Sequence, residues 1–190
     1  MAINLDRFGI KEVADVRFYT VPELEGAEET AANIYAAIKG KTPVIEFDTL
    51  KVSNIESTAE SSDARGGKGN AALISWDYGR EVTITIEDAL MSMDCLSLLF
   101  EDPENKSEGG IAINAKNFPG TYTVIGKTFA RNESNGKDHL FTFIVPKAKI
   151  QSETTITMEA EGDPSVIGMT LKALRCKNGD MVQFLRDEND

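Results

Sequence analysis

The sequence is poor in the residues that most often carry out chemistry, with one histidine, two cysteines and one tryptophan among 190 residues. A single imidazole, that of His139, cannot supply the histidine cluster of most catalytic zinc sites. Cys95 and Cys176 each lie in or beside an apolar stretch, which is typical of reduced, half-buried thiols and not of a disulfide or a metal pair. We therefore expect no cofactor, no metal site, and a chain that folds in a cytoplasm.

Long apolar runs are missing as well. No run approaches the roughly 18 residues that a membrane-spanning helix needs, and residues 1–6 lack the basic and then apolar segments of a secretory signal. Basic charge is also scarce, because 31 acidic residues outnumber 20 basic ones and give a formal charge of −11. An acidic surface repels phosphate, which disfavours adhesive binding to nucleic acid or to an anionic membrane.

The common catalytic motifs fail at their spacing. No Gly-x-Ser-x-Gly elbow accompanies His139. The run Gly66–Gly69 lacks the spacing of a phosphate-binding loop, and Asn70 follows where that loop needs a hydroxyl group. Glu60 and Asp63 do not match the oxygen pattern of an EF-hand calcium loop.

Paired carboxylates are the remaining catalytic option, because two acids can hydrolyse a glycoside. Sugar-binding clefts normally add aromatic platforms, yet aromatic residues are 7% of this chain and Trp76 is its only tryptophan. A charged solvent face explains the acids more simply, so we predict that the chain is not an enzyme. The acids considered are Glu81, Glu87, Glu153, Glu159 and Glu161.

The sequence is rich in the pattern of β-strands. Between Arg80 and Glu87 an apolar residue stands at every second position, which predicts a strand with one buried and one wet face. Turn residues separate the other runs. Short strands at this spacing favour a single mainly β domain over residues 1–190, a sandwich or a barrel. The other predicted strands lie at 14–21, 43–52, 121–131, 139–149, 153–161, 165–175 and 181–185.

One flanking α-helix is predicted to open at Glu87 and Asp88, whose charges suit the positive end of a helix, and to run to Phe100. Such a helix can cover one open face of a β core. A shorter helix ending at Gly40 is a second, open assignment for residues 23–40. The apolar residues that follow the helical period in the first helix are Ala89, Met93, Leu96 and Phe100.

Residues 53–72 interrupt the strands with a glycine-rich stretch that has almost no large apolar side chain. Such a segment cannot bury enough surface to offset its ordering entropy, and a loop this long is usually functional or disordered. It is either a free surface loop or an extended loop that orders against a neighbouring subunit. We favour the second because strand-like sequence flanks it. The candidate contact residues are Glu56, Glu60, Asp63, Arg65, Gly66, Gly67 and Lys68.

The pattern Glu-x-Thr-x-Thr-x-Glu occurs at 81–87 and again at 153–159. Strand alternation sends such rows to one face of a sheet and the intervening residues to the other. The rows are either an ordinary solvent face or a negative, hydroxyl-rich lining along which a polyanion slides without sticking. The candidate lining residues are Glu81, Thr83, Thr85, Glu87, Glu153, Thr155, Thr157 and Glu159.

Five stretches, residues 8–16, 47–53, 58–70, 73–81 and 150–171, together resemble the tail tube (major tail) proteins of tailed bacteriophages. The resemblance implies a β-sandwich or split barrel with a flanking helix, and hexameric rings that stack into a hollow tube. Inner sheets of neighbouring subunits would join, and the two Glu/Thr rows would line the lumen. Segment 53–72 would reach the next ring as a long extended loop or hairpin.

The same resemblance implies partners and a location. The partners are other copies of the chain and other tail proteins such as sheath, tape measure or baseplate, while DNA passes without specific binding. The location is the virion tail, assembled in the host bacterial cytoplasm. Two alternatives stay open: the tube of a phage-derived injection or type VI secretion machine, and a tail-tip β-sandwich binding module. Residues 23–41 match nothing in the resemblance.

Overall fold

The described part of the chain folds into one antiparallel β-sheet with two helices. The computed structural model describes residues 7–24, 26–100, 110–151, 156 and 167–186. The strand order is β2-β1-β5-β6-β7-β4-β3, with β8 paired to β6 beside this path. The elements are β1 (Phe8–Thr20), α1 (Ala31–Ile38), β2 (Ile45–Phe47), β3 (Leu50–Gly66), β4 (Ala71–Asp88), α2 (Met93–Phe100), β5 (Thr121–Asn132), β6 (Asp138–Ile150), β7 (Ile167–Ala173) and β8 (Gln183–Arg186).

The sheet is curled, so that strands from its two ends share one core. Phe18 of β1 and Ile84 of β4 lie far apart in the strand order, yet both belong to the same buried cluster. Strand β6 takes part in both halves, because its end at Ala148–Ile150 pairs with β7 and its middle pairs with β8. Burying each large aliphatic side chain contributes about 1.5–3 kcal/mol. This core therefore confirms the predicted mainly β fold with a flanking helix.

Strand alternation is as the sequence predicts. In β4, the residues from Val82 to Asp88 alternate between buried and half-buried positions, and the same alternation runs through all of β7. The predicted strands at 14–21, 121–131, 139–149, 165–175 and 181–185 correspond to β1, β5, β6, β7 and β8. The predicted strand at 153–161 lies outside the described residues, apart from residue 156.

Helix α2 begins later than the sequence suggests. Glu87 and Asp88 remain in β4 because they still pair with β7, and the Asp88 carboxylate accepts a hydrogen bond from the Thr49 hydroxyl. The helix starts after Ser92, whose Oγ accepts a hydrogen bond from the Cys95 amide at 3.1 Å. The predicted helical face is only partly correct. Leu96 and Phe100 pack against the core, but Met93 is exposed, and the fully buried side chains are Cys95, Leu98 and Leu99.

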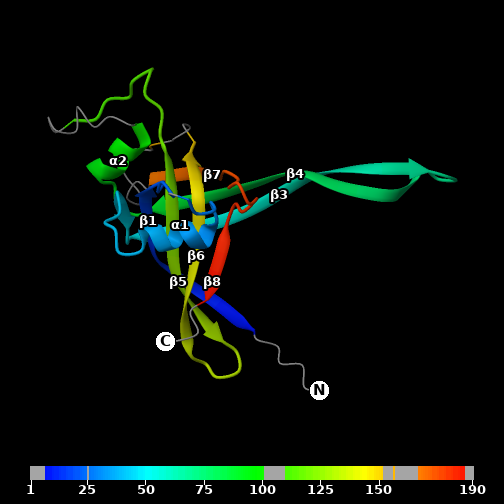
Figure 1. The fold of residues 1–190 in the computed structure, drawn as a ribbon, viewed down its shortest axis with the longest axis horizontal. Coiled ribbons are helices and arrows are strands. Elements are labelled where there is room, and N and C mark those ends of the chain that lie inside the picture. Colours follow the sequence, from blue (N-terminus) through cyan, green and yellow to red (C-terminus); the bar gives the residue numbers. More distant parts are fainter. Residues whose placement is uncertain (1–6, 25, 101–109, 152–155, 157–166, 187–190) are drawn as a thin grey trace, which may run out of the picture.

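Helix α1 covers the side of the sheet opposite to α2 (Figure 1). It lies within residues 23–40, where a short helix was an open assignment. Thr30 caps its start, accepting a hydrogen bond from the Asn33 amide at 3.2 Å, and Gly40 follows its end with φ of +84°. Ile38 packs against Ile125 of β5 and Ile144 of β6. No helix in the described ranges is long and apolar enough to cross a membrane.

One glycine in the sheet is required by packing. A Cβ on Gly126 would lie 2.0 Å from the ring of Phe143, its partner across β5 and β6, whereas a Cβ on Gly168 in β7 would meet nothing within 4 Å. We predict that Gly126→Ala lowers the free energy of unfolding by about 1–3 kcal/mol through overpacking. The matched variant Gly168→Ala should leave it almost unchanged. Urea unfolding midpoints measure both, and equal midpoints for the two variants would contradict the packing.

The two cysteines are buried and protonated. Burial, aided by the negative charge of Asp88, raises the pKa of Cys95 to about 12, and burial likewise raises the pKa of Cys176. Since the thiolate is the reactive form, neither thiol should be alkylated by iodoacetamide at pH 8 while the chain is folded, and both should react in urea. Mass spectrometry of the labelled chain measures this. Rapid labelling of the folded chain would show that the core around α2 is open.

Candidate assembly surfaces

The distal half of the β3–β4 hairpin projects from the body as an isolated arm (Figure 1), which we define as residues 60–79. Its strands pair from Glu60 opposite Tyr78 to Gly66 opposite Ala71, and the turn has positive φ at Gly67, Gly69 and Asn70. Segment 53–72 is therefore paired strand and turn, which is the hairpin form of the extended loop or hairpin that the resemblance implied. Its composition alone suggested a loop, because the hydrogen bonds that order it come from the partner strand, residues 71–86.

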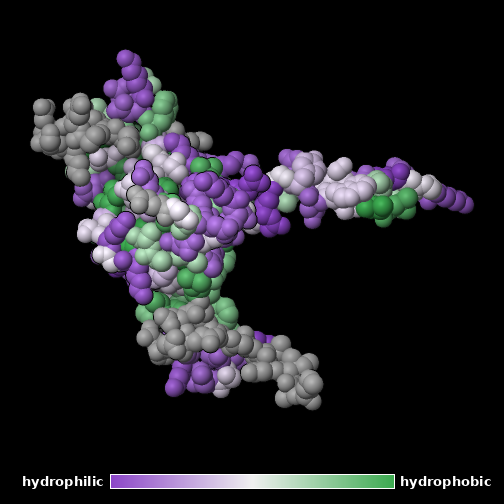
Figure 2. Space-filling view, viewed as in Figure 1, coloured by the Kyte–Doolittle hydropathy of each residue, from purple (hydrophilic) through white to green (hydrophobic). Residues whose placement is uncertain are grey.

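One face of the arm is apolar and unpartnered. Ile74, Trp76 and Tyr78 alternate along β4 and are 55%, 55% and 53% exposed, and the neighbouring Leu73 is 68% exposed. Figure 2 shows apolar side chains gathered near the end of this projection. We call these four residues the stripe. An isolated two-stranded hairpin is at best marginally stable in water, and an exposed patch of this kind marks an interaction site.

The predicted contact residues of segment 53–72 fall in different places. Glu56 lies opposite Thr83 on the body, whereas the residues from Glu60 onward lie on the arm. Asp63 and Arg65 form an ion pair with 2.6 Å between the carboxylate and the guanidinium. The remaining predicted residues, Gly66, Gly67 and Lys68, lie at or next to the turn.

Sequence reasoning missed the stripe itself. Its signal was present, because Ile74, Trp76 and Tyr78 stand at every second position. The intervening residues Ser75 and Asp77 are polar, as in a strand with one apolar face.

The first Glu/Thr row lies on one face of the sheet, as predicted. Glu81, Thr83, Thr85 and Glu87 are exposed or half-buried, and the residues between them point into the core. The second row, Glu153, Thr155, Thr157 and Glu159, lies outside the described residues. The structure therefore gives the positions of four of the eight residues that are predicted to line a lumen.

Lysines share this face. Lys172 of β7 lies opposite Thr83, and Lys149 of β6 lies opposite Lys172. The ammonium group of Lys172 is 2.6 Å from the carboxylate of Glu81, with both side chains about half exposed. An exposed pair of this kind contributes only about 0–1 kcal/mol to stability, but it offsets the charge of the row. The face is rich in hydroxyl groups and mixed in charge. The sequence alone does not predict this mixture, because it depends on the register in which the distant strands β6, β7 and β4 pair.

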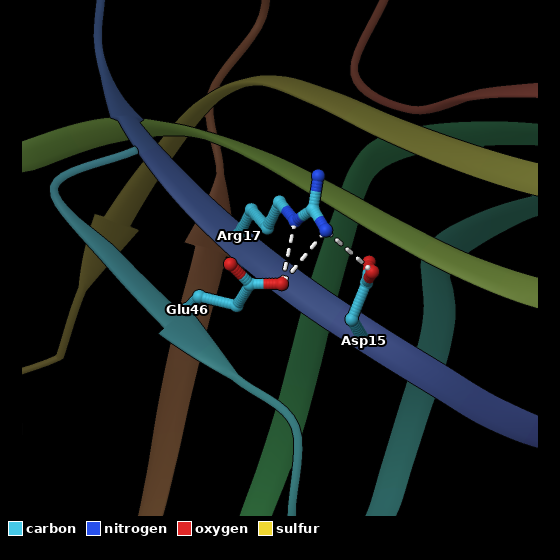
Figure 3. Close-up of polar contacts among 3 residues, drawn as sticks. All are labelled: Asp15, Arg17 and Glu46. Atoms are coloured by element: carbon cyan, nitrogen blue, oxygen red, sulfur yellow. Dashed lines mark hydrogen bonds and ion pairs between the residues drawn. The ribbon is translucent and has the colours of Figure 1, made fainter. Parts of the chain in front are cut away.

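Three strands have a single paired neighbour in the described part of the chain: β2 and β3 at the two ends of the strand order, and β8, which pairs with β6. β2 is short and is tied to β1 by Arg17, which lies between Asp15 and Glu46 (Figure 3). The guanidinium donates to Glu46 at 2.9 and 2.7 Å and to Asp15 at 3.0 Å. Burial opposes the charge of Arg17, but the two carboxylates outweigh it and raise its pKa. The outer backbone of each edge strand is able to pair with another strand.

The family of the chain follows from comparison with known proteins. The model of the YomU/Tube protein family matches residues 25–100 and 103–184. The chain therefore belongs to the YomU/Tube protein family, which confirms the resemblance to tail tube proteins and makes it a tube subunit in the general sense. No curated protein matches the chain.

Solved structures of low identity are similar over nearly the whole chain. A chain of the anti-feeding prophage cap, described as a tube terminating cap, has a TM-score of 0.48 at 13% identity and covers 98% of this chain and 100% of its own. A chain of an extracellular contractile injection system, in a sheath–tube complex in the extended state, has a TM-score of 0.45 at 14% identity and covers 98% and 93%. An Hcp protein has a TM-score of 0.33 at 10% identity and covers 93% and 100%.

Proposed function

We propose that the chain is a structural, non-enzymatic subunit of a phage-type tail tube, and that its copies form hexameric rings that stack into a hollow conduit. The observation that carries the proposal is the arm. Its apolar stripe is more than half exposed in the described structure, and it continues a strand that is anchored in the core. A surface of this kind is stable in water only when a partner covers it.

Neighbouring copies in a ring join through the edge strands β2 and β3. Joining edges in a closed ring removes the unpaired N–H and C=O groups that otherwise promote aggregation. The arm, which projects from the body, then contacts a copy in the next ring. Self-assembly of this kind needs only one type of chain, and other tail proteins such as sheath, tape measure or baseplate are its further partners.

The face that carries Glu81, Thr83, Thr85 and Glu87 is proposed to line the conduit, together with the row at 153–159. In a phage tail, the cargo is DNA, which passes during ejection without specific binding, and the particle is a virion assembled in the host bacterial cytoplasm. Acidic and hydroxyl side chains suit this task, because they do not bind phosphate tightly.

A second candidate is the tube of a phage-derived injection machine with protein cargo. The observation that favours it is the presence of Lys149 and Lys172 on the same face as the Glu/Thr row. Lysines bind phosphates by releasing counterions, so a lining of mixed charge is less suited to bare DNA. Particles purified from producing cells and treated with nuclease would separate the two: enclosed DNA supports a phage tail, and enclosed protein supports an injection machine.

We predict that replacing residues 60–79 by an Asn-Gly turn abolishes assembly but not folding. Ala59 and Arg80 would then flank a two-residue hairpin turn, and no residue of 60–79 belongs to either core cluster. The melting temperature should stay within a few degrees of the original. Negative-stain microscopy of the concentrated protein should show rings or tubes for the original chain and none for the variant.

The matched control is Asp77→Asn, which changes the polar face of the arm and should assemble normally. A chain that stays monomeric at every concentration, even with tail proteins that nucleate assembly, would refute the tube function. Specific binding in a glycan array would instead point to a tail-tip binding module.

A further inference from the structure

A groove lies at the base of the arm, on the apolar side of the sheet. It has a volume of about 330 Å³ and lies between the β3–β4 hairpin and the segment leading into β8. This is within the size range of pockets that hold a small ligand, so it has room for one or two large side chains. Its lining includes Ile55, Arg80, Val82, Met181, Val182 and Phe184.

The groove continues into an exposed aromatic surface. Phe184 is 53% exposed and stacks on Phe141 with ring centroids 5.8 Å apart, and Phe141 contacts Phe8 at 5.5 Å. Val82 at the other side belongs to the main core cluster. The groove is therefore a place where apolar core surface opens to solvent, with a wall of large side chains around it.

The arm of the same chain cannot fill this groove. β4 is one continuous strand from Ala71 to Asp88 and carries both the stripe and the groove wall. Trp76 precedes Val82 by six positions, which in an extended strand places it about 20 Å farther out. Figure 1 shows the arm running away from the body, with no turn back toward it. Any chain that covers the groove with a stripe must be a second copy.

The two surfaces are complementary in charge as well as in hydropathy. Glu60 lies opposite Tyr78, beside the stripe. Arg80 lines the groove and donates to the Ser57 hydroxyl at 3.3 Å, and within the described ranges no carboxylate forms an ion pair with it. Seating the stripe of one copy in the groove of another brings an acid to this guanidinium.

We propose that the stripe of each copy docks in the groove of a neighbouring copy, with Trp76 as the anchor and Glu60 next to Arg80. The inference rests on the proposed function and names the partner surface of the arm. Since the stripe and the groove are different surfaces, each copy inserts its stripe into one neighbour and accepts the stripe of another neighbour in its groove. When such a contact runs head to tail from one copy to the next, it links the copies into a closed ring or an open filament, which is the arrangement a tube requires.

Disulfide trapping between two different chains tests the contact. One chain carries Ile74→Cys, which lies on the stripe and leaves the Trp76 anchor intact, and the other carries Val182→Cys. The mixture is treated with copper phenanthroline and run on a non-reducing gel. The native cysteines are buried and do not compete. We expect a covalent product with the mass of two chains. The control pair, Asp77→Cys with Val182→Cys, places the thiol on the other face of the arm and should give about tenfold less product, because a disulfide needs Cα atoms within about 7 Å.

A charge exchange gives a second readout. Adding Arg80→Glu to the chain with Val182→Cys should lower the yield of cross-linked product about tenfold, the effect of roughly 1.4 kcal/mol of interaction energy. Adding Glu60→Lys to the chain with Ile74→Cys should then restore the yield. Loss without restoration would show that Arg80 acts within its own chain and would overturn the proposed pairing.

The outcomes separate this inference from the proposed function. Rings or tubes in the microscope without selective cross-linking between the stripe at Ile74→Cys and the groove at Val182→Cys would overturn the docking and leave the tube function intact. Selective cross-linking in mixtures that form no rings or tubes would support the docking and refute the tube function. Absence of both would refute both.

Discussion

The continuity of β4 is the constraint on which the rest of the structure depends. From Val82 to Asp88 every second residue is buried in the shared core, whereas all residues from Ala71 to Glu81 are exposed. The buried half fixes the direction of the exposed half, so the arm is held out from the body by the same strand that builds the core. Because no turn interrupts the strand, the described part of the chain places no surface of its own over the apolar face of the arm.

The same alternation creates the polar face opposite the core. Once Ile84 points inward, Thr83 and Thr85 must point outward, and the register with β7 brings Lys172 beside Glu81. The apolar row holds the sheet together, while the polar row remains available to a conduit. One strand therefore contributes to stability and, in the proposed tube, also to the wall and to the contact between copies. In that tube, neighbouring positions of β4 serve different roles.

Local pattern predicted much of this, and pairing between distant strands accounts for the rest. The alternation at 82–86 and the helix-ending Gly40 were readable because each depends on residues close in the sequence. The start of α2 was not, because the acids that suit a helix are held in β4 by pairing with β7. Likewise the β3 half of the arm looks like a loop on its own, and its lack of apolar residues is offset by the partner strand. The position of the lysines on the polar face could not be predicted from the sequence, because it depends on the register between distant strands.

The central claim is that the arm is half of an interface which a second copy completes. Hydrogen–deuterium exchange of the backbone amides, measured on dilute monomer and on assembled protein, tests it most directly. We predict that amides of residues 71–79 exchange rapidly in the monomer and become strongly protected on assembly, while those of β7 are protected in both because they lie in the core sheet. Equal exchange of the arm in the two states would contradict the claim.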